Sequence, residues 1–191
     1  MNSTNHDTLA RLAAAGLEKC MQRMTAVSSG AWQLAGTRVF SGKVRDAIRR
    51  EDMAHAPAAI RVKIKGDPTF ATVLIYGSEE TAHIASCFVE GAFYDPAAVD
   101  QPEVTLIEIG NIVLNALANA LLRAIGRTAI PSVPAYFKGD YGAIEAWLGA
   151  GPEIFTIISA RFTMQREGRT ASAEIFAFLP PALTEGPPAA K

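Results

Sequence analysis

Apolar residues recur along this chain with two periods, one typical of amphipathic helices and the other typical of strands. Residues 9–29 carry them at helical spacing, which predicts a first helix with Asp7 or Thr8 as its N-cap. A longer apolar run predicts a second helix over residues 101–126, with Asp100 as its N-cap. These are the two long helices of the predicted structure.

Shorter patterns predict the strands and the remaining helices. Strands are predicted at residues 37–40, 59–65, 69–76 and 135–138, and a closing hairpin at residues 153–165 and 170–179. Short helices are predicted from Ser78 to about residue 90 and around residues 141–148. Residues 41–57 are charged and predicted to be irregular, and the proline-rich tail, residues 181–191, is predicted to be disordered.

The order of these elements predicts an α+β fold, in which the two long helices pack over a mostly antiparallel sheet. A chain of 191 residues fits a single domain, 1–191, which we expect to be ordered over about residues 8–180. An order of helix, strands and helix occurs twice and suggests pseudo-duplicated halves about 90 residues apart. At that offset Glu18 falls on Glu108 and Met21 on Asn111, so the first half would lack a carboxamide that the second half keeps.

One face of the second long helix carries a narrow stripe of polar side chains on an otherwise apolar surface. Steps of three and four residues, at about 100° per residue, keep five side chains within roughly 120° of arc: Glu108, Asn111, Asn115, Asn119 and Arg123. Three asparagines on one face give up on the order of 2 kcal/mol of helix propensity relative to alanine, without a packing gain. This composition indicates a function for the carboxamides; the alternative is an ordinary solvated helix face.

The charge balance limits the classes of partner. With a formal net charge of −1, the chain lacks the basic excess that nucleic acid or an anionic membrane surface would favour. Residues 104–126 are long enough to span a bilayer, but Glu108, Arg123 and three asparagines make them a poor membrane helix. The first seven residues lack the form of a signal peptide, so we expect a soluble, cytoplasmic protein.

Cysteine and histidine positions predict neither a disulfide nor a metal site. Cys20 and Cys87 lack CxxC spacing and are expected to be buried, reduced thiols. His6, His55 and His83 are scattered and lack metal-ligand spacing.

The segment Glu108-Ile109-Gly110-Asn111, followed after 22 residues by Pro134, resembles the signature of the chemotaxis phosphatase family that includes CheC, CheX and FliY. Residues 72–82, Thr-Val-Leu-Ile-Tyr-Gly-Ser-Glu-Glu-Thr-Ala, are similar to the strand and helix that precede the active helix in CheX-type members. The resemblance covers about residues 9–180. It implies a CheC-like fold with a single, CheX-like active site.

The resemblance implies hydrolysis of the aspartyl-phosphate on a CheY-like response regulator. The regulator supplies its own Mg²⁺ and lysine, so the phosphatase needs no cofactor of its own and mainly holds a water in line with phosphorus. Asn111 would orient this water, because a carboxamide donates and accepts hydrogen bonds without adding negative charge. Glu108, about 4.5 Å away along the helix axis, would pair with the regulator's lysine. Thr105, Asn115 and Pro134 would support the site or contact the partner.

One position departs from the family pattern. Val104 stands where the family has Ser or Asp, four residues before the glutamate, and Thr105 is one step out of register. If the family residue caps the helix, Asp100 takes over that function one turn earlier. If it contacts the partner, affinity or activity is reduced in this protein.

Other functions stay open at this stage. A non-catalytic binding module would dock a regulator or a CheD-like partner through the same helix with little turnover. A flagellar-switch structural protein, like the FliM middle domain, would share the fold but lack the Glu-Asn pair. The apolar closing hairpin fits either central strands or pairing across a homodimer, as in CheX relatives.

Overall fold

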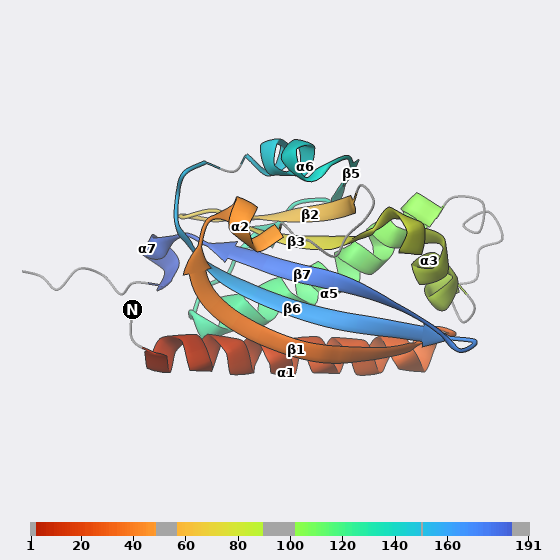
Figure 1. Ribbon diagram of the computed structural model, residues 1–191. Coiled ribbons are helices and arrows are strands. Elements are labelled where there is room, and N and C mark those ends of the chain that lie inside the picture. The colour runs from red at the N-terminus through yellow and green to blue at the C-terminus, as the bar shows by residue number, and fades with distance from the viewer. Residues whose placement is uncertain (1–2, 49–56, 90–101, 150, 185–191) are drawn as a thin grey trace, which may run out of the picture.

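The computed structural model of the protein describes residues 3–48, 57–89, 102–149 and 151–184. Its described strands form one seven-stranded sheet in the order β1-β6-β7-β3-β2-β4, with β5 also paired to β2 (Figure 1). All of these pairings are antiparallel. The strands are β1 (Ala31–Gly42), β2 (Pro57–Lys65), β3 (Phe70–Gly77), β4 (Ile130–Pro131), β5 (Ala135–Lys138), β6 (Phe155–Arg166) and β7 (Arg169–Leu179).

Helices cover both faces of this sheet, as Figure 1 shows. The two long helices, α1 (Ser3–Val27) and α5 (Pro102–Ala124), pack on one face and enclose the larger apolar core. Two short helices, α2 (Val44–Ile48) and α6 (Tyr141–Leu148), pack on the other face over a smaller core. The remaining elements are the 3-10 turn η1 (Ser78–Glu80), α3 (Thr81–Val89) and α7 (Pro181–Thr184). The predicted α+β class, with two long helices on a mostly antiparallel sheet, is confirmed.

Local signals explain why several elements begin and end where they do. The Asp140 side chain accepts a hydrogen bond from the backbone N–H of Ala143 at 2.7 Å and caps α6, which ends at Gly149 with φ of 71°. The β6–β7 hairpin turns through Glu167 and Gly168, both with positive φ, as a two-residue turn requires. These elements match their predictions closely, because their capping and turn residues are contiguous in sequence.

The long helix α5 approaches the sheet closely at one glycine. A Cβ atom on Gly110 would lie 2.7 Å from two side-chain atoms of Ile60 in β2, so only glycine fits at this crossing. Ten residues of α5 are buried. By length and composition α5 could cross a membrane, but its apolar residues form part of the protein core.

The chain contains two structurally similar halves, and their true offset differs from the predicted one. The first half has the order α1-β1-α2-β2-β3-α3, and the second half has the order α5-β4-β5-α6-β6-β7-α7. The strands β4 and β5 together correspond to the single strand β1. The buried positions of the two long helices have the same spacing at an offset of 97 residues: Leu9, Ala13, Leu17, Cys20, Met21 and Met24 correspond to Leu106, Gly110, Leu114, Leu117, Ala118 and Leu121. The offset of 90 was wrong because it aligned Gly36, which lies inside β1, with Gly126, which follows α5.

This register changes the residues that correspond between the halves. Glu108 and Asn111 now correspond to Arg11 and Ala14 of α1, and Glu18 corresponds to Asn115. The first half therefore lacks both members of the Glu-Asn pair.

Several predicted boundaries were wrong. The first helix begins at Ser3 and ends at Val27, so Asp7 and Thr8 lie inside it and do not cap it. The strand predicted at 37–40 extends over Ala31–Gly42, because the chain continues through a register shift between Leu34 and Gly36.

Other differences concern short elements. Residues 44–48, predicted to be irregular, form α2, whose Val44, Ala47 and Ile48 are buried. The tail was predicted to start at residue 181, but Pro181–Thr184 form α7. β4 was not predicted. Asp100, the predicted cap of the second long helix, lies outside the described residues, as do residues 49–56.

Candidate functional site

The polar stripe lies on the outward side of α5. Glu108, Asn119 and Arg123 are exposed, while Asn111 and Asn115 are half-buried. Leu106, Ile109 and Val113, on the opposite side of the same turns, are fully buried and hold the helix on the sheet. Glu108 and Asn111 thus stand one helical turn apart on the face that a partner can reach.

The carboxamide of Asn111 is oriented by its neighbour one turn further along α5. The Nδ2 atom of Asn115 donates a hydrogen bond to Oδ1 of Asn111 at 2.7 Å. A carbonyl oxygen has two lone pairs, so Oδ1 of Asn111 can accept a second hydrogen bond from a water or a ligand. This interaction fixes which side of the Asn111 amide is the acceptor.

Thr105 and Pro134, the other predicted supporting residues, have different positions. Thr105 is buried, with 4% of its surface exposed, and its Oγ1 has no hydrogen-bond partner among the described residues. Little of its surface is open to a partner, so a supporting role inside the site fits this position better than direct contact, and both roles stay predictions. Pro134 is half-buried and precedes Ala135, which pairs with Arg61 next to Ile60, the residue under Gly110. Pro134 therefore lies along the same stretch of β2 as the Glu108–Asn111 turn.

Two exposed apolar residues flank Glu108 on α5. Val104 lies one turn before it and is 48% exposed, and Ile112 lies one turn after it and is 39% exposed. The carboxylate therefore has an exposed apolar side chain on either side along the helix, next to the polar Asn111, and such a mixture suits contact with another protein.

A groove of about 390 Å³ runs between α1 and α5 and is lined by Asn115 and Asn119 of the polar stripe. Its polar lining comprises Lys19 and Arg23 of α1 and Asn115, Asn119 and Arg123 of α5. Cys20 also lines it, and burial raises the pKa of this thiol to about 11, an effect that the nearby Arg23 partly offsets. Lys19 and Arg23 were not predicted as site residues, because a site shared by two helices far apart in the sequence has no local pattern. Their i,i+4 spacing predicts only that the two side chains share one face of α1.

Comparisons with known proteins agree on the fold. No family model matches the sequence, and no curated protein matches it. Among solved structures, FliY from Thermotoga maritima has a TM-score of 0.65 at 14% identity, covering 96% of this chain and 93% of that chain. The FliM middle domain from H. pylori has a TM-score of 0.60 at 8% identity, with 94% of each chain covered. CheX from Vibrio vulnificus has a TM-score of 0.50 at 13% identity, with 88% of this chain and 98% of that chain covered.

The chain has the CheC/CheX/FliY fold. This result confirms the fold that the resemblance around Glu108 and Asn111 implied. At these identities the likeness concerns the fold alone, and the FliM middle domain shares it.

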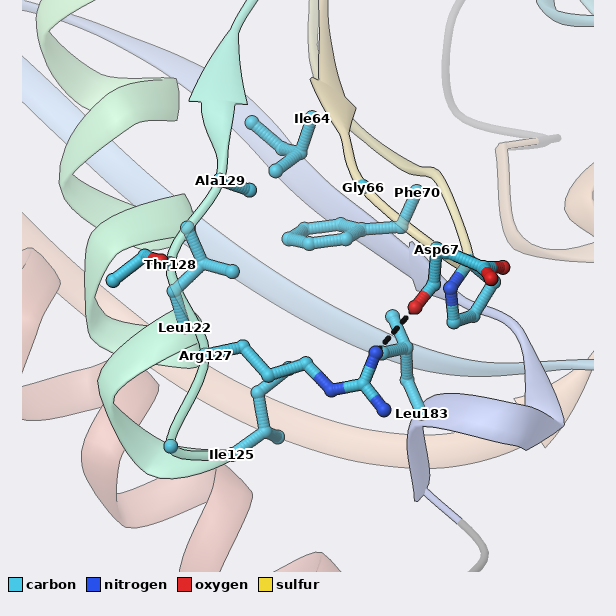
Figure 2. Close-up of a pocket in the computed structure, with 12 residues that line it drawn as sticks. Ile64, Gly66, Asp67, Phe70, Leu122, Ile125, Arg127, Thr128, Ala129 and Leu183 are labelled. Atoms are coloured by element: carbon cyan, nitrogen blue, oxygen red, sulfur yellow. Dashed lines mark hydrogen bonds between the residues drawn. The ribbon is translucent and has the colours of Figure 1, made fainter.

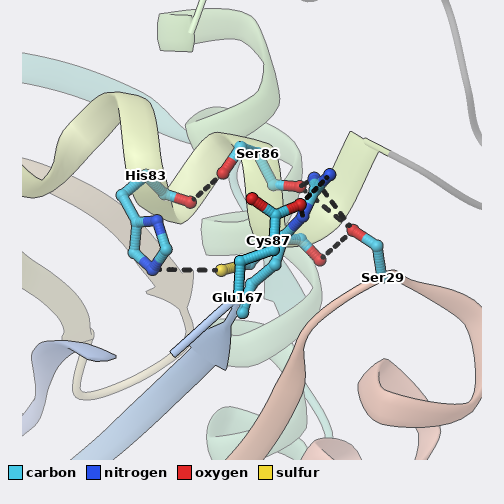
Figure 3. Close-up of polar contacts among 6 residues, drawn as sticks. Ser29, His83, Ser86, Cys87 and Glu167 are labelled. Atoms are coloured by element: carbon cyan, nitrogen blue, oxygen red, sulfur yellow. Dashed lines mark hydrogen bonds and ion pairs between the residues drawn. The ribbon is translucent and has the colours of Figure 1, made fainter. Parts of the chain in front are cut away.

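A Cys-His contact elsewhere on this CheC-like fold has a structural role. Sγ of Cys87 lies 3.7 Å from Nε2 of His83, but Cys87 is completely buried and burial raises the pKa of its thiol (Figure 3). The guanidinium of Arg166 donates hydrogen bonds to the Ser86 backbone oxygen and to Oγ of Ser29. This cluster ties the end of β6 to α3 and to the segment before β1. Its thiol is inaccessible to a substrate.

A cavity of about 430 Å³ lies at the other end of α5, where the β2–β3 turn and α7 meet it (Figure 2). Apolar side chains form much of its lining, including Ile64, Phe70 and Leu122, and the Arg127 guanidinium donates a hydrogen bond to the backbone oxygen of Asp67. Asp67 and Arg127 are the ionisable residues of this lining, and the Arg127 guanidinium is already bonded to a backbone oxygen. Within the described residues, no group of three or more His, Cys, Asp or Glu side chains could hold a metal ion.

Proposed function

We propose that this protein is a cytoplasmic phosphatase that hydrolyses the aspartyl-phosphate of a CheY-like response regulator in chemotaxis signal transduction. The observation that carries the proposal is the placement of Asn111 beside Glu108 on the outward face of α5, with its carboxamide held by Asn115. The CheC/CheX/FliY fold supports the same proposal.

The proposed chemistry needs little from the phosphatase. An acyl phosphate is reactive, and the regulator brings its own Mg²⁺ and lysine, so positioning of the attacking water is the main contribution. Asn111 accepts a hydrogen bond from this water through the second lone pair of Oδ1 and directs the water's oxygen toward phosphorus. Glu108 pairs with the regulator's lysine and sets the orientation of the two proteins.

The first prediction tests Asn111 directly. Asn111→Ala removes the group that orients water, so kcat for stimulated dephosphorylation is expected to fall by about 100-fold or more. Phosphate release is measured with CheY-type receivers encoded in the same genome, each phosphorylated by a small-molecule phosphodonor.

Asn119→Ala is the matched control for kcat, because Asn119 is exposed and lies about 12 Å further along the same helix. It lines the groove but is too far from Asn111 to orient the water. Its kcat is expected to stay within about twofold of wild type. Unchanged dephosphorylation by Asn111→Ala would overturn the proposed function.

A non-catalytic docking module is the second candidate. The similarity to the FliM middle domain, at a TM-score of 0.60, and the presence of Val104 in the family's Ser/Asp position favour it. Such a module would bind a phosphorylated regulator or a CheD-like protein through α5. It would release no phosphate above the regulator's own rate, whereas the phosphatase would.

A further inference from the structure

The groove between α1 and α5 is strongly cationic. Three basic side chains line it, Lys19 and Arg23 from α1 and Arg123 from α5, and none of its lining residues is a carboxylate. All three are exposed. Since the whole chain has a net charge of −1, this is a local concentration of positive charge.

The described ion pairs do not neutralise these charges. In the part of the chain that the structure describes, none of the three forms an ion pair with a carboxylate. Other arginines interact within the protein. Nη2 of Arg161 lies 3.1 Å from Oε1 of Glu174, and Cζ of Arg61 lies 4.3 Å from the centroid of the Trp147 ring. The groove cations are thus available to an anionic partner.

The groove is close enough to Asn111 to contact the same partner. Asn115 connects the groove to Asn111, because it lines the groove and donates a hydrogen bond to the Asn111 side chain. The α5 helix rises about 18 Å from Asn111 to Arg123. A typical protein interface buries about 800 Å² per partner, which corresponds to a disc of roughly 16 Å radius. A protein centred near Asn111 therefore extends over most of the groove.

We propose that this groove receives an acidic segment of the response regulator whose phosphoryl group meets Asn111, an inference that rests on the proposed function. Proteins hold Mg²⁺ at phosphoryl groups with carboxylates, so the surface around the phosphorylated aspartate is anionic. Lys19, Arg23 and Arg123 complement that surface, and Glu108, one turn before Asn111, pairs with the regulator's lysine. The groove thereby determines which regulators bind, while Asn111 acts on the phosphoryl group.

The test compares two double variants that change the net charge equally. Lys19→Glu/Arg123→Glu reverses the groove, whereas Arg11→Glu/Lys43→Glu places the same charge change on the other side of α1 and before α2. KM and kcat are measured with the phosphorylated receiver that the wild type dephosphorylates, at about 50 mM and 500 mM salt. At low salt, the groove variant is expected to have a KM about tenfold or more above that of the wild type, with kcat within about twofold. At high salt, the increase in KM is expected to be smaller, because salt screens the charges.

Several outcomes would overturn the inference. Equal KM values for the two double variants would show that the groove makes no specific contact. A loss of kcat at saturating regulator would assign the groove to the structure of the site. Inorganic pyrophosphate could stabilise the wild type against unfolding and fail to stabilise the groove variant, while KM for the regulator is the same in both. That result would assign the groove to a free anion. Lys19→Gln/Arg123→Gln repeats the test if charge reversal prevents folding.

The same measurements separate this inference from the proposed function. If Asn111→Ala abolishes turnover and the groove variant behaves as wild type, the phosphatase proposal stands and the docking proposal fails. If the wild type dephosphorylates no receiver, both fail.

Discussion

At the scale of single residues, the contact between Asn115 and Asn111 is the most informative. Nδ2 of Asn115 donates to Asn111, while Oδ1 of Asn115 is buried and has no partner among the described residues. An unsatisfied buried polar atom costs about 1–3 kcal/mol, and a leucine at position 115 would avoid that cost. The arrangement is therefore better explained by the orientation it gives to Asn111 than by stability.

Replacement of Asn115 by alanine is expected to lower kcat and leave KM largely unchanged. Asn115→Ala removes the donor without adding a charge to the groove. The change leaves the Asn111 amide free to rotate, so kcat should fall about tenfold, in line with the loss of one hydrogen bond.

The readout is the split between kcat and KM, measured beside thermal unfolding. A purely structural role for Asn115 would lower the unfolding temperature and leave kcat at wild-type values below that temperature. That result would contradict the orienting role.

At the scale of elements, the position of α5 depends on Gly110. The site glutamate and asparagine stand two residues before and one residue after it, so the contact with Ile60 sets how far both project from the sheet. Ile60 is fully buried and β-branched, which leaves it little room to move.

Gly110→Ala is expected to destabilise the protein, although alanine favours helix. The added methyl would lie 2.7 Å from Ile60, and overpacking of this kind costs about 1–3 kcal/mol, against about 1 kcal/mol gained in helix propensity. Urea unfolding measures the difference in the free energy of unfolding. Gly110→Ala/Ile60→Val should recover part of the loss, because valine lacks the Cδ1 atom.

Gly142→Ala in α6 is the matched control, since its nearest contact would be at 3.4 Å and the site is exposed. It should stabilise the protein by about 0.5–1 kcal/mol. Equal effects at both glycines would show that α5 can move away from β2 without penalty.

Elements were predictable from the sequence where their signals are local. β5 and α6 have the predicted bounds, because a strand pattern, a capping aspartate and a terminal glycine lie within fifteen residues of one another. The first half of β1 was missed because Gly36 reads as a break, whereas in the sheet it lies at a register shift. For the site, the sequence predicted Glu108 and Asn111 on one face. The groove and the burial of Thr105 depend on which helix lies beside α5, which no local pattern encodes.

At the scale of the whole molecule, the two halves share a fold but not a site. The positions in α1 that correspond to Glu108 and Asn111 are Arg11 and Ala14. Neither residue can pair with a lysine or direct a water as the carboxylate and carboxamide do.

We therefore expect one regulator to bind per chain. The stoichiometry can be measured by calorimetry or native mass spectrometry with the receiver held in its phosphorylated form by beryllofluoride. Glu108→Arg should abolish this binding, because it replaces the group that pairs with the regulator's lysine by one that repels it. Two regulators per chain, or one that remains bound to Glu108→Arg, would indicate a second docking surface on α1.

The sheet order has a consequence for how the chain holds together. Among the described strands, β1 of the first half pairs only with β6 of the second, and β4 and β5 of the second half pair only with β2 of the first. Each half thus completes its neighbour's sheet, as protomers do when they exchange strands. A polypeptide cut between Val89 and Pro102 would yield two fragments that each expose unpaired strand edges when alone and regain a full sheet only by recombining.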